Sequence, residues 1–309
     1  MNLLNRILSV FQKNDPLDAR DVIWTWMRNQ VGKIDLTEAT LENMCQTDLV
    51  RGFCGVNGRV ELVRLAEALG ISGISNPEND AAFKRHVPSP VNVDGLPSDE
   101  ILDRIQSALP FPITFPTFHG NCFQGLPTKY GVTSNRHIFY LWVLKRIIEL
   151  CPSRDSSILE IGAGFGVLGH YLDRAGYRDY TTIDLALINA CQTYFLARNL
   201  PERKIILSGE TEKPFDLEHK DSIKLLHSTD FKDVPKGRFS IMVNMDGLTE
   251  FGLQEASKYV KHDCAPMLFS INHEVNSYRV CDIDQPHRKR QYRYPFWLRD
   301  GYVEELYVS

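Results

Sequence analysis

The sequence lacks the cysteine pattern of a metal-binding or disulfide-linked protein. It has seven cysteines in 309 residues, an odd and widely spaced set without a C-x-x-C pair. Structural zinc sites use closely spaced cysteines, and disulfide frameworks use an even number of them. We therefore expect neither, and a reducing, cytoplasmic location suits these cysteines best.

Long apolar runs and a surplus of positive charge are also missing. No run reaches the roughly 20 apolar residues of a transmembrane helix. The opening stretch "MNLLNRILSVFQKNDPLD" is not expected to be a signal peptide, because Asn5 and Arg6 interrupt its apolar residues and no small-residue cleavage site follows. The net charge of −4 gives no electrostatic reason to expect a nucleic-acid partner.

The first third of the chain has helical periodicity. The stretches "DARDVIWTWMRNQV" and "GRVELVRLAEALGI" place apolar residues at helical spacing, and Gly70 ends the second pattern. A proline-rich stretch over 75–99 predicts a loop, and a short helix is expected over 98–108. We therefore predict a helical region over 1–110, with two roles open: shaping an acceptor site, or self-association into a homo-oligomer.

The remainder, residues 111–309, has the pattern of a Rossmann-like α/β domain. A helix is expected from Ser134, which can cap it. The runs "ILEIG", "YTTID", "FSIMVNM" and "APMLFSIN" alternate with helical patterns, which is typical of a parallel sheet with crossover helices. The last stretch, "RYPFWLRDGYVEELYV", predicts an antiparallel C-terminal hairpin at the sheet edge, with its turn at 299–301.

A glycine-rich turn follows the first run, in the stretch "LEIGAGFG". Gly162, Gly164 and Gly166 lie between a predicted strand and a predicted helix. Glycine allows a tight turn and a close approach of a ligand to the backbone. The helix N-terminus adds unpaired N–H groups and a partial positive charge. Dinucleotides and S-adenosylmethionine are the two cofactor classes that use this device.

The spacing favours the second cofactor class. A dinucleotide pattern G-x-G-x-x-G that begins at Gly162 fails at Val167. A match that begins at Gly164, "GFGVLG", leaves Gly162 and Glu160 unexplained. Glu160 suits a ligand that carries an ammonium and a sulfonium, and it would repel a pyrophosphate. Asp184, 18 residues after Gly166, can accept two hydrogen bonds from ribose hydroxyls, as either class requires.

The motif "LEIGAGFG" resembles motif I of the class I S-adenosylmethionine-dependent methyltransferases. Together with "YTTIDLALINACQTYFL", "FSIMVNMDGLTEF", "FSINHE" and "WLRDGYVEE", it resembles the sugar O-methyltransferase family of bacterial polysaccharide gene clusters, over residues 115–309. The resemblance implies S-adenosylmethionine as cofactor and a sugar hydroxyl as acceptor, on a polysaccharide, a sugar nucleotide or a glycosylated metabolite. It supplies no catalytic residue.

Further cofactor contacts are expected around the glycine turn. The resemblance places an acidic residue after the third strand on the adenine, and we favour Asp230 for it. If "KIILSGE" is the third strand instead, Glu210 is the alternative. Leu185 is expected to pack on the cofactor, unless it is plain core, and Asn244 ends the fourth strand beside it.

An alcohol acceptor needs a base or a metal, at the carboxyl ends of strands four and five. If a helix starts at Gly247, Asp246 and Glu250 share one side of it, and one serves as base or both hold a metal. In the alternative, Asp246 caps that helix and Glu250 is solvated. His273 is a third candidate base, or a structural histidine. A divalent metal is compatible with these oxygens, but no spacing demands one.

Other polar residues are candidate substrate contacts. Those before the sheet can close on the methionine end of the cofactor or on the acceptor, unless they only form a structural cover. Those after strand five can contact sugar or phosphate. The candidates are Tyr130, Arg136, His137, Asn272 and Arg279. The basic stretch 287–293 forms either a solvated loop or a rim that attracts an anionic acceptor.

Three other functions share parts of this pattern. A small-molecule or N-methyltransferase would share the cofactor site without needing an oxygen base. An NAD-dependent oxidoreductase would bind NADH at the same turn. A non-catalytic binding protein of this fold would bind the cofactor and turn over nothing.

Overall fold

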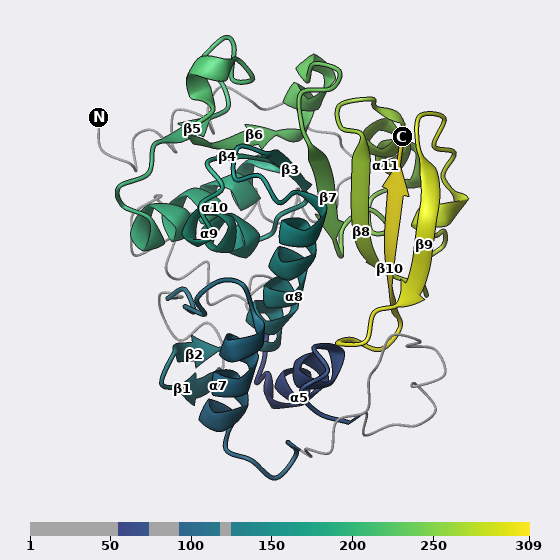
Figure 1. Ribbon diagram of the computed structural model, residues 1–309. Coiled ribbons are helices and arrows are strands. Elements are labelled where there is room, and N and C mark those ends of the chain that lie inside the picture. The colour runs from purple at the N-terminus through teal and green to yellow at the C-terminus, as the bar shows by residue number, and fades with distance from the viewer. Residues whose placement is uncertain (1–54, 74–92, 118–124) are drawn as a thin grey trace, which may run out of the picture.

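The computed structural model describes residues 55–73, 93–117 and 125–309 (Figure 1). The predicted helix in "DARDVIWTWMRNQV" and most of the predicted loop lie outside the described residues. The other helices expected before the sheet are present: α5 (Arg59–Ala68), α7 (Ser98–Ala108) and α8 (Asn135–Leu150). Ser134 caps α8 as predicted, because its side chain accepts a hydrogen bond from the His137 N–H.

An eight-stranded sheet forms the centre of the molecule. Every strand runs parallel to its neighbours except β10, which is antiparallel to both β8 and β9. The fold is thus the Rossmann-like α/β class expected from the sequence. In spatial order the strands are β5 (Ile205–Leu207), β6 (Ile223–His227), β4 (Asp179–Asp184), β3 (Ser157–Ile161), β7 (Ile241–Met245), β8 (Met267–His273), β10 (Tyr302–Val308) and β9 (Lys289–Pro295).

Two details of the sheet differ from the expectation. The C-terminal hairpin does not lie wholly at the edge, because β10 inserts between β8 and β9, and of these two hairpin strands β9 alone lies at an edge. Both candidates for the third strand are strands, but β6 is the one that pairs with β4, and β5 extends the sheet beyond it. The segment between Asp184 and Asp230 therefore contains an additional edge strand, β5.

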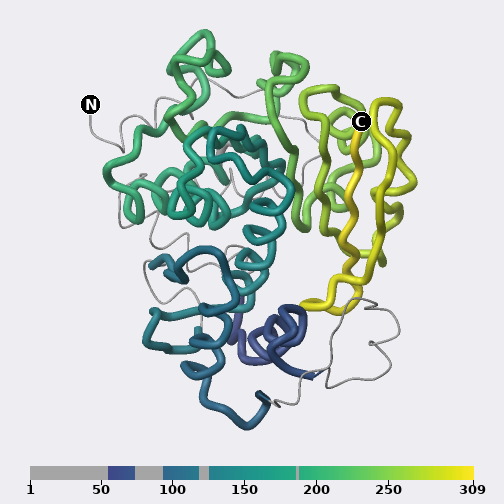
Figure 2. The backbone as a smooth tube through the Cα atoms, in the orientation of Figure 1, coloured from purple at the N-terminus to yellow at the C-terminus, as the bar shows by residue number. Residues whose placement is uncertain are grey.

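Helices cover both faces of the sheet (Figures 1 and 2). Consecutive residues of β3 point to opposite faces of the sheet, so Ile158 and Leu159 belong to two different hydrophobic clusters, one on each face. The first cluster also contains Leu62 of α5 and Ile101 of α7, so one continuous core crosses the predicted boundary at residue 110, and that boundary stays a prediction. The remaining elements are α9 (Val167–Arg174), α10 (Ala186–Asn199), α11 (Leu253–Lys261), the hairpin of β1 (Leu126–Thr128) and β2 (Gly131–Thr133), and the short helices η1 (Leu217–His219), η2 (Ser228–Asp233) and η3 (Val280–Asp282).

Helix α5 lies against the carboxyl edge of the sheet. Figure 1 shows α5 below the connection between β9 and β10. The Trp297 indole donates a hydrogen bond of 2.9 Å to Glu67 of α5, and Arg64 pairs with Asp300 at 2.9 Å. None of the described helices is long and apolar enough to cross a membrane.

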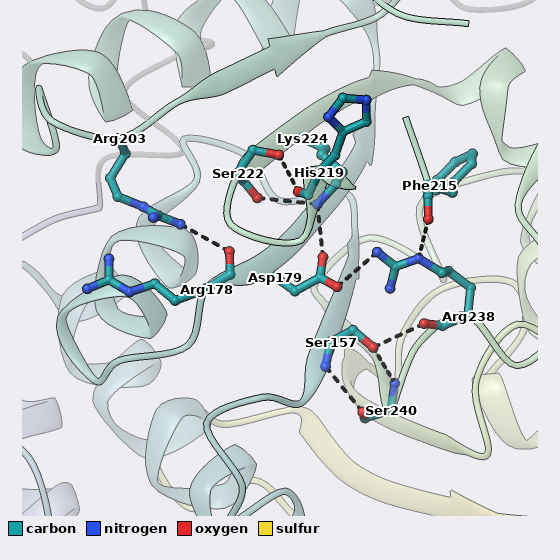
Figure 3. A network of polar contacts seen from close by, with 10 residues as sticks. All are labelled: Ser157, Arg178, Asp179, Arg203, Phe215, His219, Ser222, Lys224, Arg238 and Ser240. Carbon is teal, nitrogen blue, oxygen red and sulfur yellow. Dashed lines mark hydrogen bonds and ion pairs between the residues drawn. The ribbon is translucent and has the colours of Figure 1, made fainter. Parts of the chain in front are cut away.

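The amino edge of the sheet is closed by paired charges (Figure 3). Lys224 is completely buried, and its ammonium donates to Asp179 Oδ1 at 2.9 Å. Arg238 donates to the other oxygen of Asp179 at 2.8 Å. Ser157 and Ser240 join β3 to the start of β7 through hydroxyl and backbone groups. A buried charge with partners of this kind has a structural role. Asp184, Asp246 and His273, which the sequence singled out as functional, lie at the opposite edge.

Candidate functional site

All three glycines of the turn adopt a left-handed backbone. The φ angles are +70° at Gly162, +56° at Gly164 and +78° at Gly166, and α9 begins directly after the last of them. L-residues with side chains rarely adopt such angles. A Cβ at Gly162 would lie 3.2 Å from Cζ of Phe251. The turn therefore needs glycine both for its conformation and for the packing around it.

Asp184 at the end of β4 is hydrogen-bonded to this turn. Its carboxylate accepts hydrogen bonds from the backbone N–H of Gly164 at 3.2 Å and of Leu185 at 2.8 Å. The amide of Gln192, a residue that the sequence did not single out, donates to it at 3.1 Å. Part of Asp184 reaches solvent, but the surrounding protein desolvates it and raises its pKa to about 7, although these hydrogen bonds oppose the shift.

Glu160 on β3 is the second acid of the turn, and it is completely buried. One of its oxygens accepts a hydrogen bond from the Tyr180 hydroxyl, and Oε1 has no hydrogen-bond partner among the described residues. Burial, reinforced by the charge of Asp184, raises the pKa of Glu160 to about 8. Within the described part of the chain, neither Glu160 nor Asp184 forms an ion pair. This pair of acids suits a cationic ligand.

Asn244 and Asn272 are buried near the glycine turn, and their side chains are hydrogen-bonded to each other. Asn244 Nδ2 donates to the carbonyl of Ile161 at 2.7 Å, and its Oδ1 accepts from Asn272 Nδ2 at 2.8 Å. Asn272 also donates to Ser270 Oγ at 2.8 Å. These bonds occupy the side chains in holding β3, β7 and β8 together. Direct contacts of Asn244 with a cofactor and of Asn272 with a substrate stay predictions.

Asp246, directly after β7, is the centre of an ionic cluster. Its Oδ2 accepts hydrogen bonds from Arg136 at 2.9 Å and from Arg299 at 2.7 Å, and its Oδ1 accepts from the Tyr302 hydroxyl at 2.6 Å. Burial would raise the pKa of Asp246, but the two guanidinium groups and the hydroxyl outweigh it and hold the pKa below its ordinary value. A carboxylate with a lowered pKa and three hydrogen-bond donors is a poor general base.

The helix expected from Gly247 is not there. Residues 247–251 form a turn in which the Glu250 N–H donates to the Gly247 carbonyl at 2.9 Å, and α11 begins only at Leu253. The condition under which Asp246 and Glu250 would share one side of a helix is therefore not met. Desolvation by the surrounding protein and the nearby charge of Asp246 raise the pKa of Glu250. Glu250 is exposed, and no hydrogen bond from the described residues reaches its carboxylate.

His273 ends β8 as expected and packs against the C-terminal hairpin. Its ring lies edge-on to Tyr302, with 4.7 Å between the centroids. Its Nδ1 lies 3.2 Å from the backbone N–H of Val275, which can only donate. The proton of a neutral His273 is therefore on Nε2, and the basic nitrogen is already occupied. This geometry favours a structural role, and catalysis by His273 stays a prediction.

The predicted substrate residues do not converge on one place. Arg136 reaches Asp246, but the Tyr130 hydroxyl donates to Asp103 of α7 at 2.6 Å. Arg279 is exposed, and its Nε lies 3.5 Å from a Glu274 oxygen.

His137 lies in the core of the protein. It is completely buried, and its ring stacks on Phe115 with 5.6 Å between the centroids. Burial and the neighbouring His170 lower the pKa of His137 to about 3, so the ring is neutral. The structure thus favours the alternative interpretation of His137, in which it belongs to a structural cover.

Asp230 lies on η2, directly after the third strand β6, where the prediction placed it. Its carboxylate accepts hydrogen bonds from the Ser208 hydroxyl and from the His227 N–H, the latter at 3.1 Å. Glu210, the alternative, follows β5 and accepts from the Leu207 N–H at 2.9 Å. The strand order therefore favours Asp230 over Glu210, and a contact with adenine stays a prediction.

The basic stretch 287–293 is neither a loop nor a fully exposed rim. Arg288 is buried and donates to the carbonyls of Ala265 and Val260, each at 2.9 Å. Residues 289–295 form β9, in which Arg293 lies 3.2 Å from Glu305. In the described residues, no group of three or more His, Cys, Asp or Glu side chains has the arrangement of a metal site.

Known proteins resemble this chain only in broad outline. No protein-family model and no curated protein sequence matches it. The methyltransferase domain of a bacterial CtHen1 aligns with 54% of this chain and 97% of its own length, at 9% identity and a TM-score of 0.37. The magnesium protoporphyrin IX methyltransferase (ChlM) of Synechocystis PCC 6803 with bound SAM aligns with 56% of this chain and 79% of its own length, at 13% identity and a TM-score of 0.39.

A third similar structure is the PH0226 protein of Pyrococcus horikoshii OT3. It aligns with 57% of this chain and 92% of its own length, at 10% identity and a TM-score of 0.39. Likenesses at this level carry no argument about the function of this chain, which depends on the residues of its own site.

Proposed function

We propose that the protein is an S-adenosylmethionine-dependent methyltransferase. The observation that carries the proposal is the turn after β3. It combines three left-handed glycines, the buried acid Glu160 and the acid Asp184 at the end of the neighbouring strand β4. The unpartnered Oε1 of Glu160 and the lack of a side chain at Gly162 fit a cationic ligand that approaches the backbone closely.

Each acid has a distinct part in cofactor binding. Asp184 holds the two ribose hydroxyls, and Gln192 and the Gly164 N–H keep its carboxylate in place. Glu160 supplies negative charge for the methionine ammonium and the sulfonium. When bound, the cofactor would supply an electrophilic methyl group. Asp230 is the proposed adenine contact.

We further propose that the acceptor is a sugar hydroxyl and that Glu250 is the base. Glu250 would accept the proton that the acceptor hydroxyl loses when it is methylated. Asp246 is unsuited to this task because its carboxylate is already bound by two guanidinium groups. Glu250 has a raised pKa, and no donor from the described residues occupies its carboxylate, as a general base requires. The choice of a sugar rests on the sequence resemblance.

The helical region 1–110 has a proposed part in this site. Its helix α5 contacts the connection that follows β9: Glu67 accepts a hydrogen bond from Trp297, and Arg64 pairs with Asp300. We propose that this region shapes the acceptor side, with self-association as the alternative. The cysteines of the described residues are all free thiols, which supports a cytoplasmic location.

The decisive test of the cofactor is calorimetric titration with S-adenosylhomocysteine and, in parallel, with NADH. We expect micromolar binding of S-adenosylhomocysteine alone. Asp184→Ala should weaken it by about 1.5–3 kcal/mol, the range for hydrogen bonds to a charged group. Binding of NADH alone would overturn the proposal.

The acceptor is tested with a panel of sugars, sugar nucleotides and amines, followed by NMR of the methylated product. A methyl ether on a sugar supports the proposal, and a methylated nitrogen supports the alternative small-molecule or N-methyltransferase. Glu250→Gln should lower the rate of transfer to an alcohol while S-adenosylhomocysteine binds as before. An unchanged rate would remove Glu250 from the mechanism.

A further inference from the structure

One carboxylate connects three distant parts of the chain at the acceptor side. Arg136 comes from the first turn of α8, Arg299 from the connection between β9 and β10, and Tyr302 from the start of β10. All three donate to Asp246, at 2.9, 2.7 and 2.6 Å. We call these four residues the Asp246 clamp.

The backbone of Asp246 is held in an unusual conformation. Its φ of 64° is the only left-handed value of a non-glycine residue in the described part of the chain. Its N–H donates to the Ile271 carbonyl at 2.8 Å, which fixes the peptide against β8. A strained residue of this kind persists only where its surroundings over-determine it, and such residues cluster at functional sites.

This conformation sets the path of the turn that follows. The ring of Phe251 lies against Gly162, since a Cβ there would be 3.2 Å from its Cζ. The Tyr278 hydroxyl lies within hydrogen-bond distance of the carbonyls of Leu248 and Phe251 and holds the turn from its far side. The turn 247–251 therefore packs against the glycine turn through Phe251, and Glu250 precedes Phe251 in the chain.

We propose that Asp246 is a positioning residue: with Arg136, Arg299 and Tyr302 it fixes the turn 247–251 and so places the Glu250 carboxylate beside the glycine turn. The inference rests on the proposed role of Glu250 as base and adds to it a device that joins α8 and the C-terminal hairpin. None of the four clamp residues needs to touch the acceptor for this role.

The clamp also acts on Glu250 through its charges. The charged groups that face Glu250 are Asp246 on its own turn, Arg136 from α8 and Arg299 from the hairpin connection. The negative charge of Asp246 favours a protonated Glu250, whereas each guanidinium favours the ionised form. Removal of the acid and removal of an arginine should therefore have opposite effects.

The test compares Asp246→Asn with Arg299→Gln in the full chain. Side-chain carboxyls are followed by carbon NMR during a pH titration of protein labelled at glutamate, and Glu250→Gln identifies the resonance. We expect Asp246→Asn to lower the pKa of Glu250 and Arg299→Gln to raise it. No shift in either variant would overturn the inference, because a Glu250 held beside the clamp must respond when one of the clamp charges is removed.

Hydrogen exchange of the backbone tests the positioning itself. Both variants should exchange the amides of 247–251 at least about tenfold faster, as expected on loss of a hydrogen bond between charged groups. Asp300→Asn is the matched control, since it lies in the same connection and breaks only the exposed pair with Arg64. It should change neither the exchange nor the pKa of Glu250, and unchanged exchange in the clamp variants would contradict the inference.

The outcome for the proposed function is read separately. If the wild-type protein does not bind S-adenosylhomocysteine, the proposed function fails. If it binds, and the clamp variants show neither the opposite pKa shifts nor the faster exchange, only the positioning role of Asp246 fails.

Discussion

At the scale of single residues, the acids of the site fall into two electrostatic classes. Asp246 is neutralised by guanidinium groups, and its pKa is low. Glu160 and Asp184 have no cation beside them in the described structure, and burial raises their pKa values to about 8 and about 7. An ionised carboxylate without a partner destabilises the folded protein, and a cationic ligand relieves that cost.

The first prediction concerns Glu160→Gln. The pKa of Glu160 is raised from 4.5 to about 8 on folding, so the stability present below pH 4.5 is lost as the pH rises toward 8. The glutamine variant avoids this loss and keeps an oxygen for the Tyr180 hydroxyl. Without ligand at pH about 8.5, it should be more stable than the wild type by about 1–3 kcal/mol in urea unfolding.

The same variant should bind the cofactor more weakly. S-adenosylmethionine affinity of the wild type should rise as the pH rises through 7 to 8, with proton release visible when titrations in two buffers are compared. Glu160→Gln should lose most of this dependence, and the exposed Glu218→Gln should keep it. A wild-type affinity that is flat over this range would refute the prediction.

At the scale of elements, α8 joins the acceptor side to the core. Its first turn carries Arg136 toward Asp246, and the next residue, His137, is buried beside Phe115 of the hydrophobic cluster. His170 of α9 lies near it, also buried, with a pKa lowered to about 4. Two neutral histidines therefore lie between the helices that cover this face of the sheet.

The second prediction is a loss of stability in acid that depends on this pair. The pKa of His137 falls from 6.5 to about 3 on folding, so the unfolded chain binds more protons below pH 6.5 and stability drops as the pH falls. His137→Phe, which keeps a ring on Phe115, removes part of that drop. Urea unfolding gives the difference in the free energy of unfolding between the variant and the wild type. At pH about 4.5 this difference should favour the variant by up to about 2 kcal/mol more than at pH 7.

The test compares the change in unfolding free energy between pH 7 and 4.5 in the two proteins. The comparison is needed because acids with raised pKa values, such as Glu160, change stability in the opposite direction over part of this range. If wild type and His137→Phe lose the same free energy of unfolding between pH 7 and 4.5, the histidine is not the titrating group.

At the scale of the whole molecule, the two edges of the sheet have different tasks. The amino edge holds Lys224 and Asp179 in a closed network, as Figure 3 shows. The carboxyl edge holds the glycine turn, the Asp246 clamp and the contact with α5. Stability and binding should therefore be separable by substitutions at opposite edges.

The third prediction tests this separation with Lys224→Met. The change removes a buried charge from Asp179, which keeps Arg238 as a partner. We expect a loss of about 1–3 kcal/mol in the free energy of unfolding, less than for a carboxylate left entirely alone. S-adenosylhomocysteine affinity should be unchanged in calorimetry at a temperature where the variant is folded, and an affinity loss like that of Asp184→Ala would show that the edges are coupled.

The sequence by itself determined the features that depend on neighbours along the chain. Helical spacing and caps predicted α7 and α8, alternation of apolar runs predicted the Rossmann-like sheet, and the glycine spacing predicted a tight turn beside Glu160. Each follows from local propensity or periodicity, which are written in consecutive residues.

Only the tertiary structure decided which side chains meet. Arg299 and Tyr302 lie more than fifty residues from Asp246 in sequence, and nothing in their local pattern indicates that they donate to it. The same holds for Arg288, which looked like a surface cation and is buried against backbone carbonyls. The left-handed backbone of Asp246 and the start of α11 at Leu253, not at Gly247, were likewise visible only in the structure.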